Sequence, residues 1–390
     1  MIEFHSSERS SLGVEMELEL VDAGSRALTA AASDILDEMG RAHPGGAHPK
    51  AKHELFESTV EIITGICSTV SEARGDLEGT LAELRTQTDR RGLELLCSGT
   101  HPFSDWSEQK VSPDPRYHEL LEEMQWCGRR LQIFGIHVHV GVRSPEKAIA
   151  IANALSSYIP HFLGLSASSP YWMGQDTGLA SARSKIFEGL PTAGLPYQLA
   201  GWPEFETFMT TLVTARAISS IREVWWDIRP HPNFGTVELR ICDGLPTLRE
   251  VAAVAAVSQC LVEWMNGLFD RGQDLRTHRG WVIRENKWRA ARYGVDAEII
   301  LDDEGHLVPL KDAVADLVAE LAPVAARLGC AAELEHALVM VERPSYMRQR
   351  EVVTNGGSLV DVVDSMIAEL RTDEAWPSPV AGEDGRAGGA

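Results

Sequence analysis

The sequence predicts an α+β fold in which an antiparallel sheet carries polar side chains on one face. Segments that read as helices and strands do not alternate one for one along the chain, as they do in parallel α/β folds. The expected strands alternate apolar with polar residues, which suits antiparallel strands better than strands buried on both faces. Because no repeat or linker divides the chain, we expect one domain over residues 1–371. A disordered tail rich in Gly, Pro and Ala is expected over residues 372–390.

The first expected strand is SLGVEMELEL, residues 11–20. Because side chains alternate faces along a strand, Glu15, Glu17 and Glu19 would share one face, opposite an apolar one. Three like charges in a row repel one another, and burying them without partners is costly. The acidic face is therefore either solvated or covered by something positively charged. This strand alone leaves both interpretations open.

A second acidic strand lies in KHELFESTVEIITGI. It follows a predicted helix over residues 32–40 and the loop RAHPGGAHPK, which is rich in Gly, Pro and His. Glu57 and Glu61 would share one face of this strand, and Glu54 lies just before it. The same pattern on a second strand favours a shared acidic face over a chance alternation.

The other elements follow from apolar spacing and from turn residues. LELLCSGTHPF is expected to be a buried strand that runs into a loop. The long stretch of residues 164–202 is rich in Ser, Gly and Pro with interspersed aromatics, and such irregular stretches usually line a site. Helices are predicted over residues 71–92 (capped by Ser71), 117–132, 144–163 (capped by Ser144, with Pro145 first), 203–216 and 247–269, and at about 310–329, 331–342 and 357–371.

Two more strands add histidines and an arginine to the polar face. IFGIHVHVGV places His137 and His139 on one face. The segment WWDIRPHPNFGTVELRICDGLP contains a fourth strand with Glu238 and Arg240 on one face. Carboxylate oxygens select Mg²⁺, Mn²⁺ or Ca²⁺ rather than zinc, and imidazoles in the set favour Mg²⁺ or Mn²⁺. The planar guanidinium of Arg240 suits a phosphate or a carboxylate.

Each of these patterns has a simpler alternative when it is taken alone. An H-x-H pair also occurs in ordinary strands, and a strand salt bridge explains E-x-R. A zinc hydrolase is the main rival for the histidines, yet the chain has no H-E-x-x-H spacing. It also has no G-x-x-x-x-G-K-[ST] loop, G-x-G-x-x-G turn or G-x-S-x-G elbow. If ATP binds, the usual glycine loops do not hold it.

The composition favours small-molecule partners. The net charge is −21, from 36 Lys and Arg against 57 Asp and Glu, which argues against nucleic acid or an anionic membrane as a partner. The six cysteines show no C-x-x-C spacing and are expected to be reduced. The start of the chain does not resemble a signal peptide, and the longest apolar run, about residues 251–257, is too short to span a membrane. We expect a soluble cytoplasmic protein.

Five segments in this order resemble a known family. They are GVEME, ESTVEIITG, GIHVHVG, RPHPNFGTVELR and RENKWRAARYG. Together they resemble the carboxylate–amine ligases related to glutamate–cysteine ligase, type 2 branch, over about residues 11–371. The resemblance implies a glutamine synthetase-like catalytic domain, in which a curved antiparallel sheet forms a funnel-shaped active site. It also implies ATP-dependent formation of an amide through an acyl-phosphate, with glutamate (γ-carboxyl) as the expected acid and cysteine or another amine as acceptor.

The resemblance assigns roles to individual residues. The assignment of Glu54 as a metal ligand comes from the resemblance alone. Most of the other metal ligands are also predicted by the alternation of side chains along the strands. Glu238, Arg240 and Arg229 are the expected catalytic residues, and Arg229 and Trp226 the expected substrate contacts. The expected ligands of Mg²⁺ (or Mn²⁺) are Glu15, Glu17, Glu54, Glu61, His137 and Glu238. The expected nucleotide and phosphate contacts are His139, Arg240, Arg284, Asn286, Lys287, Arg348 and Arg350.

Several of these roles compete with structural ones. His139 is alternatively a hydrogen-bonded strand residue, Arg229 a structural residue beside Pro230, and Arg348 and Arg350 part of a solvated helix start. Glu19 and Glu57 are expected to compensate charge behind the ligands, and the Trp225/Trp226 pair to shape the acceptor pocket.

Two other functions stay open at this point. A guanidino kinase would share the fold and the metal ligands but release a phosphorylated product, and a relative without catalysis would bind metal or ligand only. The resemblance also suggests a homodimer. Replacing Glu238 with glutamine is expected to stop turnover and, since little packing is lost, to leave the fold intact.

Overall fold

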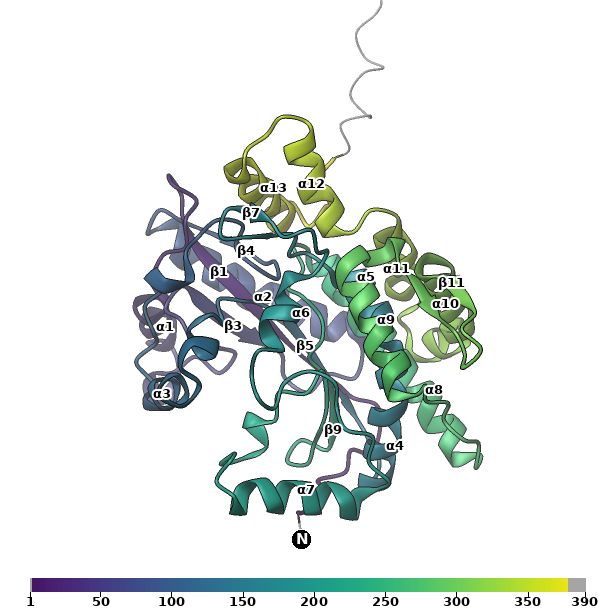
Figure 1. The fold of residues 1–390 in the computed structure, drawn as a ribbon. Helices are drawn as coiled ribbons and strands as arrows, with labels where there is room; N and C mark the ends of the chain where they lie inside the picture. The colour runs from purple at the N-terminus through teal and green to yellow at the C-terminus, as the bar shows by residue number, and fades with distance from the viewer. Residues whose placement is uncertain (1, 378–390) are drawn as a thin grey trace, which may run out of the picture.

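A seven-stranded antiparallel sheet forms the centre of the protein (Figure 1). The computed structural model describes residues 2–377. The strand order is β2–β3–β1–β5–β9–β8, and β4 pairs with the far end of β1. The seven strands are β1 (Leu12–Asp22), β2 (Ala51–His53), β3 (Thr59–Ile63), β4 (Leu93–Leu96), β5 (Ile136–Gly141), β8 (Ile228–His231) and β9 (Thr236–Leu239).

Helices surround the sheet, and two short hairpins complete the chain (Figure 1). The hairpins are β6 (Tyr171–Trp172) with β7 (Gln175–Asp176) and β10 (Glu298–Ile300) with β11 (Leu307–Pro309). The helices are α1 (Ala32–Gly40), α2 (Val70–Asp89), α3 (Pro115–Arg129), α4 (Pro145–Leu155), α5 (Ile159–Ser166), α6 (Ala182–Phe187), α7 (Trp202–Thr214), α8 (Leu248–Asp270), α9 (Gly280–Tyr293), α10 (Leu310–Leu328), α11 (Ala331–Glu342), α12 (Ser345–Thr354) and α13 (Leu359–Thr372).

One face of the sheet is apolar and packs against α2 and α8. Along β1 the residues Val14, Met16 and Leu18 are fully buried in this core, and every second residue points to the opposite face. Alternate apolar residues of β3, β5 and β9 belong to the same core. The predicted α+β class with a two-faced antiparallel sheet is therefore confirmed.

Several predicted boundaries differ from those observed. Thr69, not Ser71, caps α2, because its side chain accepts a hydrogen bond from the backbone N–H of Glu72. The predicted cap Ser144 is confirmed. The helix expected over residues 144–163 is interrupted at Ser156–Tyr158 by a 3₁₀ turn, and Pro160 then lies in the first turn of α5, where its missing N–H is tolerated.

The irregular stretch and the fourth strand also contain more structure than expected. The stretch of residues 164–202 includes the β6–β7 hairpin and helix α6. The segment with the fourth strand forms two strands, β8 and β9, joined by a turn in which Gly235 has a φ of +63°. Both cases concern elements of two to six residues, which are too short to show a clear period.

Two helical stretches have the length and apolar composition of a membrane span. They are Pro145–Ser166 and α8, and 83% and 78% of their most apolar windows are buried inside the protein. Both therefore occupy positions of core helices.

The described part of the predicted tail, residues 372–377, is ordered by contacts with the domain. Asp373 pairs with Arg74 (2.6 Å), and Glu374 pairs with Arg249 (2.9 Å). The backbone N–H of Trp376 donates to Glu369 (2.7 Å). The expectation of disorder directly after Arg371 is therefore corrected, and the rest of the predicted tail, residues 378–390, lies outside the described residues.

The buried ring of His101 predicts a loss of stability in acid. Its Nδ1 accepts the backbone N–H of Ser104 (3.0 Å) and its Nε2 faces the carbonyl of Arg26 (2.9 Å), so the neutral ring is fully bonded. Burial lowers the pKa of His101 from its usual 6.5 to about 4. The stabilisation of the folded state by the neutral His101 ring is therefore fully present above pH 6.5. It is lost as the pH falls toward 4, because between these pH values the histidine binds a proton in the unfolded chain but not in the folded one.

Urea denaturation at pH 7 and pH 4.5 tests this expectation. Wild type should lose about 2 kcal/mol more free energy of unfolding over this range than His101→Asn, whose amide oxygen keeps an acceptor near Nδ1. His118→Asn, at an exposed histidine whose ring makes no hydrogen bond or ion pair within residues 2–377, serves as the control and should behave as wild type. Equal losses in wild type and His101→Asn would show that the ring is not held neutral.

Candidate active site

The strand registers bring the predicted polar residues together on the face opposite the core. Glu15 lies opposite His137, Glu17 opposite Glu61, and His139 opposite Glu238. This face forms one side of a cavity of about 940 Å³. Of the predicted site residues, the cavity is lined by Glu15, Glu17, Glu54, Glu61, His137, His139, Arg229, Glu238 and Arg240.

Glu238 is clamped between two arginines at the centre of this face. Arg229 donates to it from Nε (2.8 Å) and Nη2 (2.7 Å), and Arg240 from Nη1 (2.5 Å). Only 1% of Glu238 is exposed. Burial by itself would raise the pKa of Glu238, but the charges of Arg229 and Arg240 hold it well below its usual range. Glu238 is therefore a fixed negative charge.

The two histidines of β5 contact the same group of carboxylates. His137 Nδ1 lies 3.0 Å from Glu15, and His139 Nε2 lies 3.5 Å from Glu15 and 3.7 Å from Glu238. Burial and the charge of Arg240 lower the pKa of His137 to about 4, so this imidazole is neutral and free to act as a ligand. Ligand atoms of Glu15, His137 and Glu238 all lie within 4.8 Å of one another.

Three further carboxylates lie at the β1–β3 side of the cavity. Burial raises the pKa of Glu17 and of Glu54 to about 7, and repulsion between neighbouring carboxylates adds to the effect. The pKa of Glu61 is raised well above its usual range for the same two reasons, although Lys52 lies 3.1 Å away. Ionisation of all three carboxyl groups together is therefore unfavourable unless a further cation lies beside them.

The cavity residues fit a hard divalent cation. They offer several carboxylate oxygens and one neutral imidazole, which matches the ligands of Mg²⁺ and Mn²⁺. A bound cation would relieve the repulsion that raises the carboxylate pKa values. The predicted ligands Glu15, Glu17, Glu54, Glu61, His137 and Glu238 all face this one cavity.

Arg183 is a cavity residue that the sequence did not single out. It lies on α6, is 3% exposed, and donates to the backbone carbonyls of Arg240 and Ile241 (3.3 Å). Gly135 leaves the space for it, since a Cβ at Gly135 would overlap the guanidinium. Its position in the irregular stretch of residues 164–202 was the available signal, but nothing in the local sequence distinguished it from the other basic residues.

A stacked pair of rings lies at the β8–β9 end of the cavity. The rings of His231 and Phe234 are parallel within 7°, with centroids 4.2 Å apart. His139 meets both edge-on, at 5.7 Å and 5.5 Å. Phe234 is 59% exposed, so this pair offers an aromatic surface next to the charged residues. Neither ring was assigned a role from the sequence.

The residues predicted from α9 and the Trp pair lie elsewhere. Trp226, Arg284 and Lys287 line a second cavity of about 630 Å³, whereas Trp225 faces the main one. Lys287 is buried and pairs with Asp227 (2.6 Å) and Glu188 (2.5 Å). This group therefore lies outside the main cavity, and its expected phosphate and substrate contacts stay a prediction.

Asn286, Arg348 and Arg350 also have structural partners instead of a place in the main cavity. Asn286 exchanges two hydrogen bonds with the backbone of Ile300 (2.8 and 2.7 Å). Arg348 is buried between Glu250 (2.8 Å) and Glu369 (2.5 Å). Arg350 pairs with Asp176 (2.8 Å) near the surface. Most donors of these side chains already bond to the protein, and none of the three residues lines the main cavity, so their predicted phosphate contacts stay a prediction.

Glu19 and Glu57 lie outside the cavity lining. Glu19 is fully buried and accepts hydrogen bonds from the backbone N–H and hydroxyl of Ser98 (3.2 and 2.8 Å). Glu57 accepts from the backbone and hydroxyl of Ser33 in the first turn of α1 (3.0 and 2.5 Å). Both therefore support local structure and do not face the predicted ligands.

Comparisons with known proteins agree on one family. Residues 11–354 match the model of the Glutamate-cysteine ligase family 2. A Frankia alni protein named "Putative glutamate–cysteine ligase 2-1" is 60% identical over 374 residues, with 95% of this chain and 98% of that protein covered. A Thermobifida fusca protein named "Putative glutamate–cysteine ligase 2" is 53% identical, with 95% and 93% covered.

Two solved structures share the fold. A glutamate–cysteine ligase from Francisella tularensis in complex with AMP aligns with a TM-score of 0.70 at 13% identity, and covers 98% of this chain and 92% of that one. A bifunctional glutathione synthetase from Pasteurella multocida aligns with a TM-score of 0.66 at 15% identity, covering 94% and 52%. At such identities the likeness concerns the fold.

Proposed function

Because the chain belongs to the Glutamate-cysteine ligase family 2, we propose that it is an ATP-dependent ligase that joins a carboxylate to an amine. Its substrates are small molecules, with glutamate as the acid and cysteine or another amine as the acceptor. The observation that carries this proposal is the single cavity in which a group of carboxylates adjoins the buried Arg229–Glu238–Arg240 clamp.

The chemistry requires positioning and charge balance more than a protein nucleophile. A carboxylate is a poor electrophile, and transfer of a phosphoryl group to it turns one of its oxygens into a leaving group. That transfer brings negative charges together, so it depends on cations placed before the reaction begins. The expected Mg²⁺, held by Glu15, Glu17, Glu54, Glu61, His137 and Glu238, would supply charge neutralisation when bound.

Arg240 is positioned to contact the transferred phosphoryl group. Its Nη1 is held by Glu238, while its buried Nε has no hydrogen-bond partner among the described residues. A buried donor without a partner is costly, so an acceptor oxygen from a substrate would restore a lost hydrogen bond. Glu238 thus orients Arg240, and the Nη2 group, which makes no hydrogen bond within residues 2–377, is a donor left for a phosphoryl oxygen in the cavity.

Arg229 acts in this proposal by positioning Glu238, not by binding substrate. Its Nε and Nη2 donate to Glu238, and its Nη1 donates to the carbonyls of Ile221 (2.9 Å) and Val224 (3.1 Å). Arg222 lines the same cavity and takes part in no ion pair within residues 2–377. We therefore assign the substrate carboxylate to Arg222 in place of Arg229.

The proposal is tested by measuring ADP release with Mg-ATP and glutamate in the presence of a panel of amines that includes cysteine. Mass spectrometry then identifies the products. An amide formed with cysteine alone would identify a glutamate–cysteine ligase, and an amide with another amine would keep the mechanism and change the acceptor. A phosphorylated product without an amide would indicate the kinase alternative. Binding of Mg-ATP without turnover of any pair would point to another acid, and absence of binding would refute the proposed site.

A further inference from the structure

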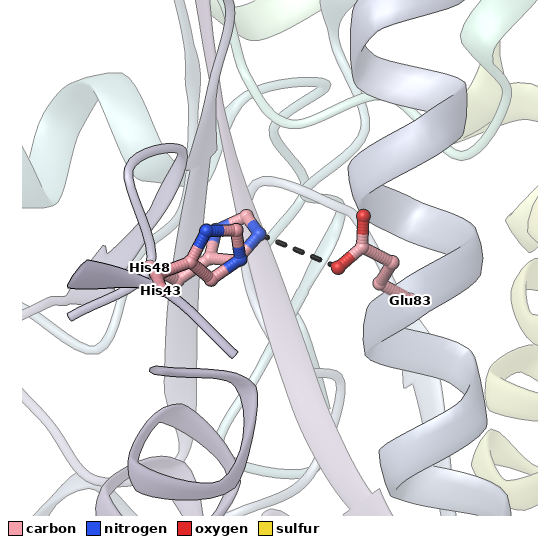
Figure 2. Close-up of side chains that lie close together, drawn as sticks. All are labelled: His43, His48 and Glu83. Atoms are coloured by element: carbon pink, nitrogen blue, oxygen red, sulfur yellow. Dashed lines mark ion pairs between the residues drawn. The ribbon is translucent and has the colours of Figure 1, made fainter. Parts of the chain in front are cut away.

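Two histidines and a glutamate, none of them among the predicted Mg²⁺ ligands, come together at the edge of the main cavity (Figure 2). His43 and His48 lie in the loop between α1 and β2, and Glu83 lies on α2. Figure 2 shows both imidazoles next to the carboxylate of Glu83, which reaches toward them from the helix. One ligand atom from each residue lies within 4.8 Å of the other two.

The distance between His48 and Glu83 resembles that between two ligands of one ion more than that of a hydrogen bond. His48 Nε2 and Glu83 Oε2 are 3.4 Å apart, whereas an N–H···O hydrogen bond is usually about 2.9–3.0 Å long. Zinc bonds of about 2.0–2.1 Å place neighbouring tetrahedral ligands about 3.3 Å apart. The rings of His43 and His48 meet edge to face with centroids 4.5 Å apart. The side chain of Glu83 is 60% exposed, so the surrounding protein leaves it room to adjust to an ion.

The loop between the histidines is built to keep them close. Its sequence from His43 is HPGGAHP, and Gly45 and Gly46 have φ values of +85° and +75°, which other residues rarely adopt. Gly40 at the end of α1 lies against the carbonyl of Gly46, where a Cβ would overlap it. The chain therefore turns back within four residues, and the two imidazoles face the same side.

We propose that His43, His48 and Glu83 bind a zinc-like divalent cation and thereby fasten this loop to α2. Two imidazoles and one carboxylate suit zinc, which accepts three protein ligands and one water in a tetrahedral site. The site in the main cavity offers mostly carboxylates and suits Mg²⁺, so the two sites differ in preferred metal. Gly46, Ala47 and His48 also line the main cavity, so the ion would brace part of its wall.

Ion binding has a defined consequence for the His48 ring. The backbone N–H of Lys50 donates to His48 Nδ1 (3.1 Å), so the neutral ring carries its proton on Nε2, the atom that faces Glu83. A metal ion on Nε2 takes the place of this proton, and the ring of a neutral bound histidine then carries its proton on Nδ1. The Lys50 hydrogen bond must open in the process, so the Lys50 amide reports on occupancy.

Cobalt titration in excess Mg²⁺ tests this proposal, because Mg²⁺ keeps the main cavity occupied while tetrahedral Co²⁺ absorbs strongly in the visible range. We expect one tetrahedral Co²⁺ per chain, displaced by Zn²⁺. His43→Ala and Glu83→Gln alter residues at the protein surface and should each weaken binding at least about 100-fold, since even hydrogen-bond partners of ligands contribute about 10–100-fold. The control Glu78→Gln changes another exposed carboxylate of α2 and should bind Co²⁺ as wild type.

Amide exchange provides the second measurement. In wild type the Lys50 amide should exchange faster with solvent deuterium when Zn²⁺ is bound, and it should not change in Glu83→Gln. Absence of a tetrahedral Co²⁺ spectrum, or an equal spectrum in the two site variants, would overturn the proposal. So would a Lys50 amide that stays protected with Zn²⁺ bound. None of these measurements depends on the ligase activity.

Discussion

Replacing Glu238 with glutamine is expected to reduce turnover at least about 1000-fold and to lower the free energy of unfolding by about 3 kcal/mol or more. The amide keeps the shape of the side chain but removes the negative charge between Arg229 and Arg240. Two buried guanidinium groups then lack a counter-charge, and Arg240 loses the contact that orients it. The expectation from sequence that the fold would be unaffected is therefore revised, because the clamp lies in the protein interior.

Rates of ADP release and urea denaturation measure the two effects. The matched control is Glu19→Gln, in the same sheet but outside the cavity lining. Burial raises the pKa of Glu19 well above its usual range, and its hydrogen bonds come from Ser98 and not from a cation, so the control removes no partner of a buried charge and should keep turnover. Wild-type turnover in Glu238→Gln would remove this residue from the mechanism. Lost turnover with unchanged stability would show that the two arginines do not need its charge.

Replacing Arg348 with methionine is expected to lower the free energy of unfolding by about 3–5 kcal/mol and to leave the KM for ATP unchanged. Arg348 on α12 joins Glu250 of α8 to Glu369 of α13, and all three side chains are almost fully buried. Removing the guanidinium leaves two buried carboxylates without a cation. None of the three residues lines the main cavity, so the folded variant should bind nucleotide normally.

Arg350→Met is the control for this prediction. Its pair with Asp176 is half-exposed, and such pairs contribute about 0–1 kcal/mol, so the variant should stay close to wild type in stability. The measurements are urea denaturation and ATP saturation curves at a temperature where both variants are folded. A raised KM for ATP with unchanged stability in Arg348→Met would instead restore the phosphate contact that the sequence suggested.

The sequence predicted most of the polar face because its signal is local. A two-residue period assigns Glu15 with Glu17, His137 with His139, and Glu238 with Arg240 to one side of their strands, whatever the partners are. Glu54 lies outside this pattern and came from the resemblance alone. The same alternation predicted the core residues of these strands, because the residues between the polar ones are apolar and point to the opposite face of the sheet.

Several arginine and lysine side chains that the sequence assigned to the site lie outside the main cavity, because their partners are distant in sequence. Arg348 and Glu250 are 98 residues apart, and Lys287 and Asp227 are 60 apart. No local pattern distinguishes a basic residue that meets a buried carboxylate from one that meets a substrate. Arg183 was missed for the same reason, because its place in the cavity depends on tertiary packing of α6 near the sheet.

The central position of β1 also bears on how the protein folds. Glu15 meets His137 across 122 residues of chain, and His139 meets Thr236 across 97. Contacts this far apart require large loops to close, which is characteristic of slow-folding topologies. The catalytic face therefore cannot exist in a partly assembled sheet. Refolding monitored by tryptophan fluorescence and by nucleotide turnover should show activity returning only in the slowest phase, after most of the chain has become compact.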